Sequence, residues 1–142
     1  MKFRTLQRGV MKGDIRSQKD IEQLVNTFYE RINNDERLGY IFNKVAGVNW
    51  DSHLKVMYNF WGNIILFTGN YEGNPMNLHQ HINHLKPLQE IDFERWNDIF
   101  ISTVDALFEG PNSKLAKQRA INISDVMKAN IVQEESGGDK IY

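Results

Sequence analysis

Cysteine is absent from this chain of 142 residues, and its absence removes several kinds of chemistry. Disulfide bonds, thiolate metal sites and a cysteine nucleophile are all excluded. A chain without cysteine is also compatible with a reducing cytoplasm, where we expect this protein to reside. The formal net charge of −1 lacks the basic excess that nucleic-acid-binding proteins usually carry. The sequence therefore predicts no nucleic-acid partner.

Long apolar runs are also missing. The longest unbroken run, from Ile64 to Phe67, is far too short to span a bilayer. The basic N-terminal stretch has no continuous apolar core of the kind that a signal peptide carries. Glycine-rich phosphate loops, nucleophile elbows and the HExxH zinc motif do not occur either. We expect no membrane partner, and we expect any chemistry to depend on a small number of side chains.

What is present is the composition of one soluble globular domain. Hydrophobic residues make up 41% of the chain and charged residues 25%, which is typical of such domains. No internal repeat or linker divides the sequence. We predict a single domain over 1–142, with flexible tails at about 1–13 and 136–142.

Capping residues and apolar residues at helical spacing predict several helices. The four long helices cover about 17–33, 50–69, 92–110 and 112–131. Their expected opening residues are Ser17, Asn49 or Asp51, Asp92, and Asn112 or Ser113. Ser17 with Asp20 three residues later resembles a capping box, and a short helix is expected over Met76–Leu85. The stretch 35–49 should be a compact connection. With no alternating strand pattern, the fold class is all-α.

Histidine is scarce and unevenly placed. Of four histidines, three fall close together at His79, His81 and His84, and the fourth is His53. Both settings lie beside aromatic-rich segments. A histidine on such an apolar helix is either an ordinary one, satisfied by a backbone carbonyl or turned to solvent, or a metal ligand, since imidazole is the commonest metal-binding side chain. Both interpretations stay open on spacing alone.

Tyr29 and Trp96 carry polar atoms on faces that should be buried. Tyr29 falls on the face of Val25 and Ile32, so its ring should point inward while its hydroxyl needs a partner. Trp96 follows Phe93 on another buried stripe, and its indole N–H needs an acceptor. Each is either an ordinary core residue or a donor to a ligand.

Six sequence pieces, in this order and spacing, resemble the truncated hemoglobins. They are FYERINND with LGYIFN over 28–43, Trp50 with His53, NFW at 59–61, YEGNPMNLH at 71–79, DFERW at 92–96 and AKQRA at 116–120. The resemblance covers about 14–131. The paired-glycine signals of the first two groups of that family are absent, which favours the third group. The resemblance implies a truncated globin-like helical sandwich, two helices over two, around a heme.

The resemblance also implies a role for individual residues. His79, four positions after Pro75, would be the proximal iron ligand, although the chain is longer than some relatives here and His81 or His84 could replace it. Tyr29, His53 and Trp96 would form the distal side of the heme pocket. The residues expected to pack against the porphyrin are Phe42, Phe28, Met57, Phe60 and Phe93. Many relatives carry histidine where this chain has Asp92, a departure that we expect to affect helix capping rather than iron.

The function implied is that of a heme b protein that binds oxygen, nitric oxide, carbon monoxide or another small diatomic gas. With cysteine absent, thiolate ligation of the iron is unavailable. Three polar distal side chains would slow oxygen release, so storage is disfavoured. Oxygen-dependent nitric oxide detoxification, or another redox role in which an unidentified reductase re-reduces the heme, is favoured by analogy. Whether the protein is an enzyme is left open.

Two interpretations of other classes also stay open. One is a non-heme metalloprotein that uses His79, His81 and His84, although only residues three or four apart share a helix face. The other is a cofactor-free helical interaction module whose aromatic residues are simply core. An absorption spectrum would separate all three, because only heme has a Soret band.

Overall fold

Six helical elements make up the part of the chain that the structure describes. In this computed structural model the described residues are 12–45, 47–69 and 89–135. The elements are α2 (Gln18–Asn34), α3 (Glu36–Tyr40), the π-helix η1 (Ile41–Val45), α4 (Trp50–Leu66), α6 (Glu90–Leu107) and α7 (Pro111–Glu135). The predicted all-α class is therefore confirmed. The predicted helix Met76–Leu85 lies outside the described residues, as do the predicted tails apart from 12 and 13.

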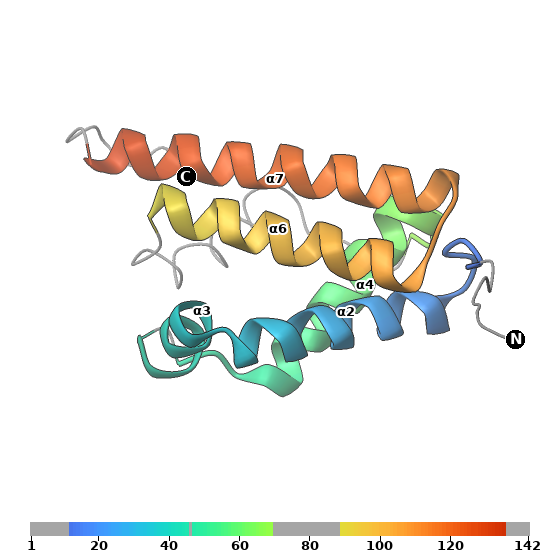
Figure 1. Cartoon of the computed structure of the whole chain (residues 1–142), viewed down its shortest axis with the longest axis horizontal. Coiled ribbons are helices and arrows are strands. Elements are labelled where there is room, and N and C mark those ends of the chain that lie inside the picture. The colour runs from blue at the N-terminus through green and yellow to red at the C-terminus, as the bar shows by residue number, and fades with distance from the viewer. Residues whose placement is uncertain (1–11, 46, 70–88, 136–142) are drawn as a thin grey trace, which may run out of the picture.

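The long helices form two pairs that lie one over the other. α6 and α7 run side by side in opposite directions, with α2 beneath α6 and α4 behind it (Figure 1). α2 contacts both α4 and α6, and α4 also contacts α7. The pair α2 and α4 thus packs on the pair α6 and α7, which is the expected two-over-two sandwich. No helix among the described residues is long and apolar enough to cross a membrane.

Local capping explains where α2 and α4 begin. Ser17 accepts a hydrogen bond from the backbone of Asp20, whose carboxylate in turn accepts one from the backbone of Ser17, so the predicted capping box is confirmed. Asn49, one of the two expected caps, accepts from the backbone of Ser52 at the start of α4. α4 ends at Leu66, somewhat before its predicted end, because Phe67 adopts the left-handed conformation with φ of 56°.

The predicted cap of α6 is wrong. α6 begins at Glu90 with Gln89 as its N-cap, and Asp92 lies in the first turn. The carboxylate of Asp92 still serves the helix end, because it accepts a hydrogen bond from the backbone N–H of Gln89 at 2.8 Å. The expectation that Asp92 affects capping is therefore confirmed, from one turn inside the helix rather than from its cap.

The predicted start of α7 is also too late, for a tertiary reason. The helix begins at Pro111, whose missing N–H costs nothing in a first turn. Its capping carboxylate comes from Asp14, which accepts from the backbone N–H groups of Asn112 (2.8 Å) and Ser113 (2.9 Å). Gly110 permits this approach: its φ is 149°, and a Cβ there would lie 2.5 Å from the carboxyl carbon of Asp14.

The connection after α2 is helical rather than irregular. Asp35 caps α3 by accepting from the backbone of Leu38 at 3.0 Å. Gly39 lets α3 close against the end of α2, because a Cβ at this position would lie 2.6 Å from the backbone oxygen of Asn33. η1 then follows without a break. This compact unit carries Phe42 into the core, where it is 1% exposed.

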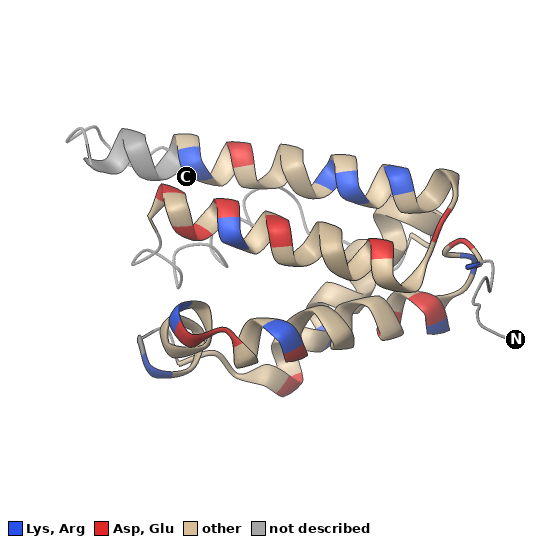
Figure 2. Ribbon diagram, in the orientation of Figure 1, with Lys and Arg blue, Asp and Glu red and all other residues tan. Residues whose placement is uncertain are grey.

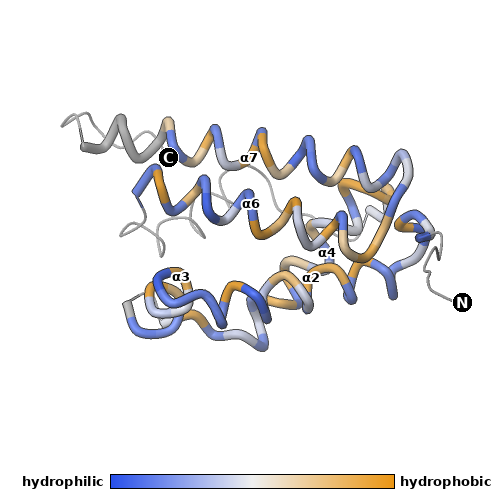
Figure 3. The backbone as a smooth tube through the Cα atoms, in the orientation of Figure 1, coloured by the Kyte–Doolittle hydropathy of each residue, from blue (hydrophilic) through white to orange (hydrophobic). Residues whose placement is uncertain are grey.

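Charge and hydropathy separate the surface from the core. Apolar residues recur along α2, α6 and α7 between hydrophilic stretches (Figure 3). Acidic residues predominate on α6 and basic residues on the neighbouring part of α7 (Figure 2). One ion pair links the two helices directly, Lys117 with Asp105 at 2.7 Å. Complementary charge thus accompanies apolar packing between α6 and α7.

Candidate functional site

Four rings from three segments meet beside the start of α4. Tyr29 of α2, Phe42 of η1, and Trp50 and His53 of α4 form this group, which we call the ring cluster. The ring of Tyr29 lies 4.9 Å from that of His53 and 5.3 Å from that of Trp50, centroid to centroid. Phe42 stacks on Trp50 at 5.9 Å and 13°. Three of the residues that the resemblance places at a heme are thus in mutual contact.

The local structure explains why these rings meet. Trp50 and His53 are three residues apart in one helix and so share a face. Their own rings lie 5.6 Å apart, edge to face. The backbone N–H of His53 donates to Asn49 at 2.9 Å, which places this face within the first turn of α4. Tyr29 comes from the buried face of α2, the helix that packs along α4.

Burial raises the pKa of Tyr29 and so reinforces its neutral form. Its side chain is only 5% exposed. Burial in the ring cluster raises the pKa of the Tyr29 hydroxyl well above its ordinary value of 10.0, because the charged phenolate is disfavoured away from water. The hydroxyl is therefore neutral throughout the physiological range. A neutral hydroxyl has a proton to donate to a ligand.

Trp96 reaches the ring cluster through Phe28 rather than directly. Phe28 lies edge-on to Trp96 at 5.3 Å and contacts its neighbour Tyr29 at 4.7 Å. Trp96 also stacks on Phe100 at 5.8 Å and 10°. The indole is 9% exposed, so it is almost fully enclosed. The structure thus joins α6 to α2 through aromatic contacts beside the predicted distal side.

The other predicted heme neighbours are buried as well. Met57 and Phe60 are 7% and 9% exposed, and Phe93 is 1% exposed. His53, Met57 and Phe60 occur at positions i, i+4 and i+7 of α4, which is one stripe of a helix. The donor set and the lining fit a porphyrin in kind: apolar and aromatic side chains surround a small number of polar groups.

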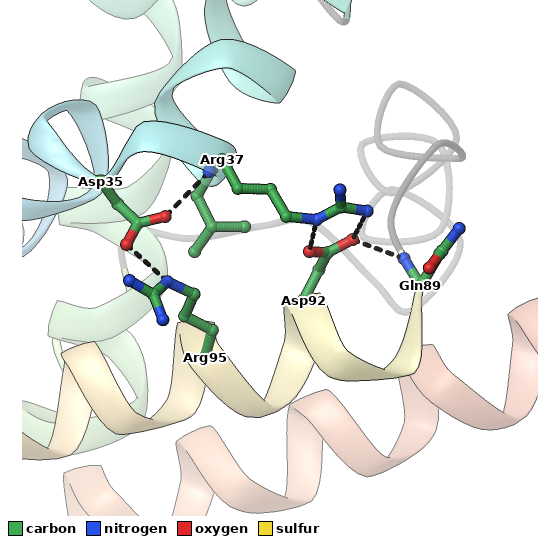
Figure 4. Close-up of polar contacts among 6 residues, drawn as sticks. Asp35, Arg37, Gln89, Asp92 and Arg95 are labelled. Carbon is green, nitrogen blue, oxygen red and sulfur yellow. Dashed lines mark hydrogen bonds and ion pairs between the residues drawn. The ribbon is translucent and has the colours of Figure 1, made fainter.

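A network of ion pairs fastens the segment that carries Phe42 to α6 (Figure 4). Arg37 of α3 makes two hydrogen bonds to the carboxylate of Asp92, one of them at 3.0 Å. Arg95 bonds to Asp35 at 2.5 Å. Both arginines are about half exposed, whereas the carboxylates of Asp92 and Asp35 are 1% and 6% exposed. Two buried carboxylates therefore hold α3 against the start of α6.

The ion pair and hydrogen bonds of Asp92 also affect its pKa. Burial raises the pKa of Asp92, but hydrogen bonds from Arg37 and from the backbone of Gln89 outweigh it and hold the pKa below its ordinary value of 3.8. The same pair raises the pKa of Arg37. Asp92 is therefore a charged, fully engaged carboxylate, which agrees with a structural role.

Comparison with known proteins identifies the family. Over 113 residues, 78% of this chain and 87% of the relative, the sequence is 31% identical to the group 3 truncated hemoglobin ctb of Campylobacter jejuni. The chain belongs to the group III truncated hemoglobins. A crystal structure of group III truncated hemoglobin from Campylobacter jejuni also matches this truncated hemoglobin, with a TM-score of 0.68 and 28% identity over 84% of this chain and 94% of that one. No protein-family model matches the sequence.

Family membership confirms the resemblance drawn from the sequence pieces and the helical fold that it implied. It does not test the assignment of single residues. His79, His81 and His84 lie outside the described residues, so the proximal ligand stays a prediction. Within the described ranges, no group of three or more histidine, aspartate or glutamate side chains could hold a metal ion.

One member of the ring cluster in this truncated hemoglobin was not predicted as a site residue. Trp50 was noted only as part of a motif with His53, yet it contacts Tyr29, Phe42 and His53. Its indole N–H also donates to the side chain of Asn43 at 2.7 Å. The three-residue spacing from His53 was the available signal, since it places both rings on one helix face.

Proposed function

We propose that this protein binds heme b through His79 and takes up oxygen, nitric oxide and carbon monoxide at the open position of its iron. The observation that carries the proposal is the ring cluster, in which Tyr29 and His53 lie 4.9 Å apart in a buried aromatic setting, in a chain of the truncated hemoglobin family. Heme would supply an iron with one coordination position free for a small gas.

The chain's own residues would discriminate among gases. Tyr29, held neutral by burial, would donate a hydrogen bond to a gas that becomes negatively polarised on binding. His53 would close the same side of the pocket, and Trp96 would be a second donor. Phe42, Phe28, Met57, Phe60 and Phe93 would exclude water from the plate-shaped group. Strong donors stabilise bound oxygen more than carbon monoxide, because carbon monoxide is far less polarised when bound.

Hemin titration tests the central part of this proposal. The apo-protein should bind one equivalent and develop a Soret band, which lies at roughly 400–430 nm for heme bound to protein. Titration without a stoichiometric endpoint would refute heme binding. Metal content without that band would instead favour a non-heme site, and neither signal would favour an interaction module.

Histidine substitutions test the ligand. His79→Gly should weaken heme retention or give a spectrum that added imidazole restores. His81→Ala and His84→Ala are the matched controls and should leave the five-coordinate ferrous spectrum intact. If His84→Gly needs imidazole and His79→Gly does not, the iron is held by His84.

The finer role that we propose is oxygen-linked redox chemistry, and nitric oxide detoxification is the reaction that we favour. We propose that it takes place in the cytoplasm, where a reductase returns the iron to its ferrous state. Three polar distal candidates, Tyr29, His53 and Trp96, favour this over oxygen storage. Aerobic nitric oxide consumption by the reduced protein tests it. Consumption no faster than that of the His79→Gly variant would refute this role while leaving gas binding intact.

A further inference from the structure

Trp50 is the outer member of the ring cluster. Tyr29, Phe42 and His53 are 5%, 1% and 5% exposed, whereas Trp50 is only partly buried. Its ring contacts all three, stacking on Phe42 and lying 5.3 Å from Tyr29 and 5.6 Å from His53. Trp50 is therefore the most solvent-exposed member of the cluster, at the start of α4.

Asn43 holds this ring in place. The indole N–H of Trp50 donates to Oδ1 of Asn43 at 2.7 Å. The amide nitrogen of Asn43 donates to the side chain of Asn33 at 2.7 Å and to the backbone oxygen of Gly39 at 2.8 Å. Because every polar atom of the amide is engaged, rotating it by half a turn would set donors against the indole N–H. One side chain thus links the start of α4 to α2, α3 and η1.

We propose that Trp50 and Asn43 form a latch that controls access of small gases to the distal side and keeps His53 and Tyr29 in position. The inference rests on the proposed function, since it concerns the same pocket. The bond to Asn43 restrains the Trp50 ring in its contacts with Tyr29 and His53. Motions of this kind gate many buried sites. Trp50 is here a positioning residue, because it acts through Tyr29 and His53.

The strength of one hydrogen bond sets the size of the effect. A net intramolecular hydrogen bond shifts an equilibrium by about 2- to 12-fold. Without this bond, the fraction of molecules in which the Trp50 ring has moved away from the cluster should rise by that factor. As long as this fraction stays small, gas association should accelerate by about the same factor. Trp50→Phe removes the N–H and keeps a ring in the cluster. Asn43→Ala removes the acceptor and leaves the indole, and it also removes the bonds from Asn43 to Asn33 and Gly39.

Carbon monoxide rebinding after flash photolysis tests the latch in the heme-loaded protein. Each single variant should rebind about 2- to 12-fold faster than the parent. The double variant should be no faster than the faster of the two single variants, because both remove the bond between Trp50 and Asn43. Tyr58→Phe is the matched control: it also removes a hydrogen bond from α4 to α2, between the Tyr58 hydroxyl and Asn26, but Tyr58 lies outside the ring cluster, so rebinding should not change.

Hydrogen exchange of the indole gives a readout that does not depend on gas binding. The Trp50 indole proton, assigned by its loss in Trp50→Phe, should exchange faster in Asn43→Ala, whereas those of Trp61 and Trp96 should not change. Single variants that rebind within about 1.5-fold of the parent, or effects that multiply in the double variant, would overturn the latch. A parent without a Soret band would refute the proposed function instead, and the indole exchange would still test the bond.

Discussion

Replacing Tyr29 by phenylalanine removes one hydroxyl from the proposed distal side and should change little else. The ring would remain in contact with Phe28, Trp50 and His53, at centroid distances of 4.7, 5.3 and 4.9 Å in the parent. No cavity larger than one oxygen atom would form, so the cost in stability should be small. The variant thus isolates the hydrogen bond that we assign to the hydroxyl.

The size of the effect follows from the state of that hydroxyl. Because burial raises the pKa of Tyr29 above its ordinary value of 10.0, the group carries its proton at any pH of interest. A hydrogen bond to a group that bears charge contributes about 1.5–3 kcal/mol, which corresponds to about 10- to 150-fold in affinity. Tyr29→Phe should accelerate oxygen dissociation by a factor in that range. Carbon monoxide dissociation should change far less.

Stopped-flow displacement of oxygen, with carbon monoxide dissociation measured in parallel, tests this reasoning. Tyr58→Phe is again the control, because Tyr58 loses an equivalent hydroxyl outside the ring cluster. An oxygen off-rate in Tyr29→Phe within about twofold of the parent would show that Tyr29 is only a core residue. Equal acceleration for both gases would point to general loosening of the pocket.

Three further outcomes are expected. Trp96→Phe should accelerate oxygen dissociation by a smaller factor than Tyr29→Phe, measured in the same stopped-flow experiment, because the ring contacts among the described residues join Trp96 to the cluster through Phe28. Asp14→Ala should lower the free energy of unfolding, measured by urea unfolding, by about 1–2 kcal/mol, which is the usual cost of a lost helix cap. A change below about 0.3 kcal/mol would contradict the assignment of Asp14 as the cap of α7. Acid should lower the free energy of unfolding of the parent more than that of Asp14→Ala. Burial raises the pKa of Asp14, but hydrogen bonds from Asn112, Ser113 and Ile15 outweigh it and hold the pKa below the ordinary value of 3.8. The charged carboxylate therefore stabilises the fold fully at pH values above 3.8, and this stabilisation is lost as the pH falls through the lowered pKa. Equal losses on acidification in both proteins would contradict this linkage.

The ion pairs between α3 and α6 give the ring cluster a support that lies away from the rings themselves. Arg37 and Arg95 reach from solvent to carboxylates that are almost fully buried. α3 continues directly into η1, which carries Phe42 and Asn43. The position of the latch therefore depends on how α3 is held against α6 as well as on its own hydrogen bonds.

The sequence by itself was sufficient for features that depend on neighbours along the chain. The capping box of Ser17 and Asp20, the cap at Asn49 and the buried face of α2 all follow from spacing, because one helical turn brings these residues together. The all-α class followed from helical spacing and the lack of an alternating strand pattern, and the family followed from the order of the sequence pieces. Tyr29, Phe42 and His53 could be named as one site only through the resemblance, since they come from three separate elements.

Tertiary structure alone decided the contacts between distant segments. Asp14 caps a helix that begins 97 residues later in the chain, since its carboxylate accepts from Asn112 and Ser113 at separations of 98 and 99. Arg37 meets Asp92 across 55 residues. Neither partner carries a local signal for the other, because a hydrogen bond between distant segments depends on how whole helices pack. The latch on Trp50 has the same origin: Asn43 is placed by η1, and only the packing of η1 on α4 brings its amide to the indole.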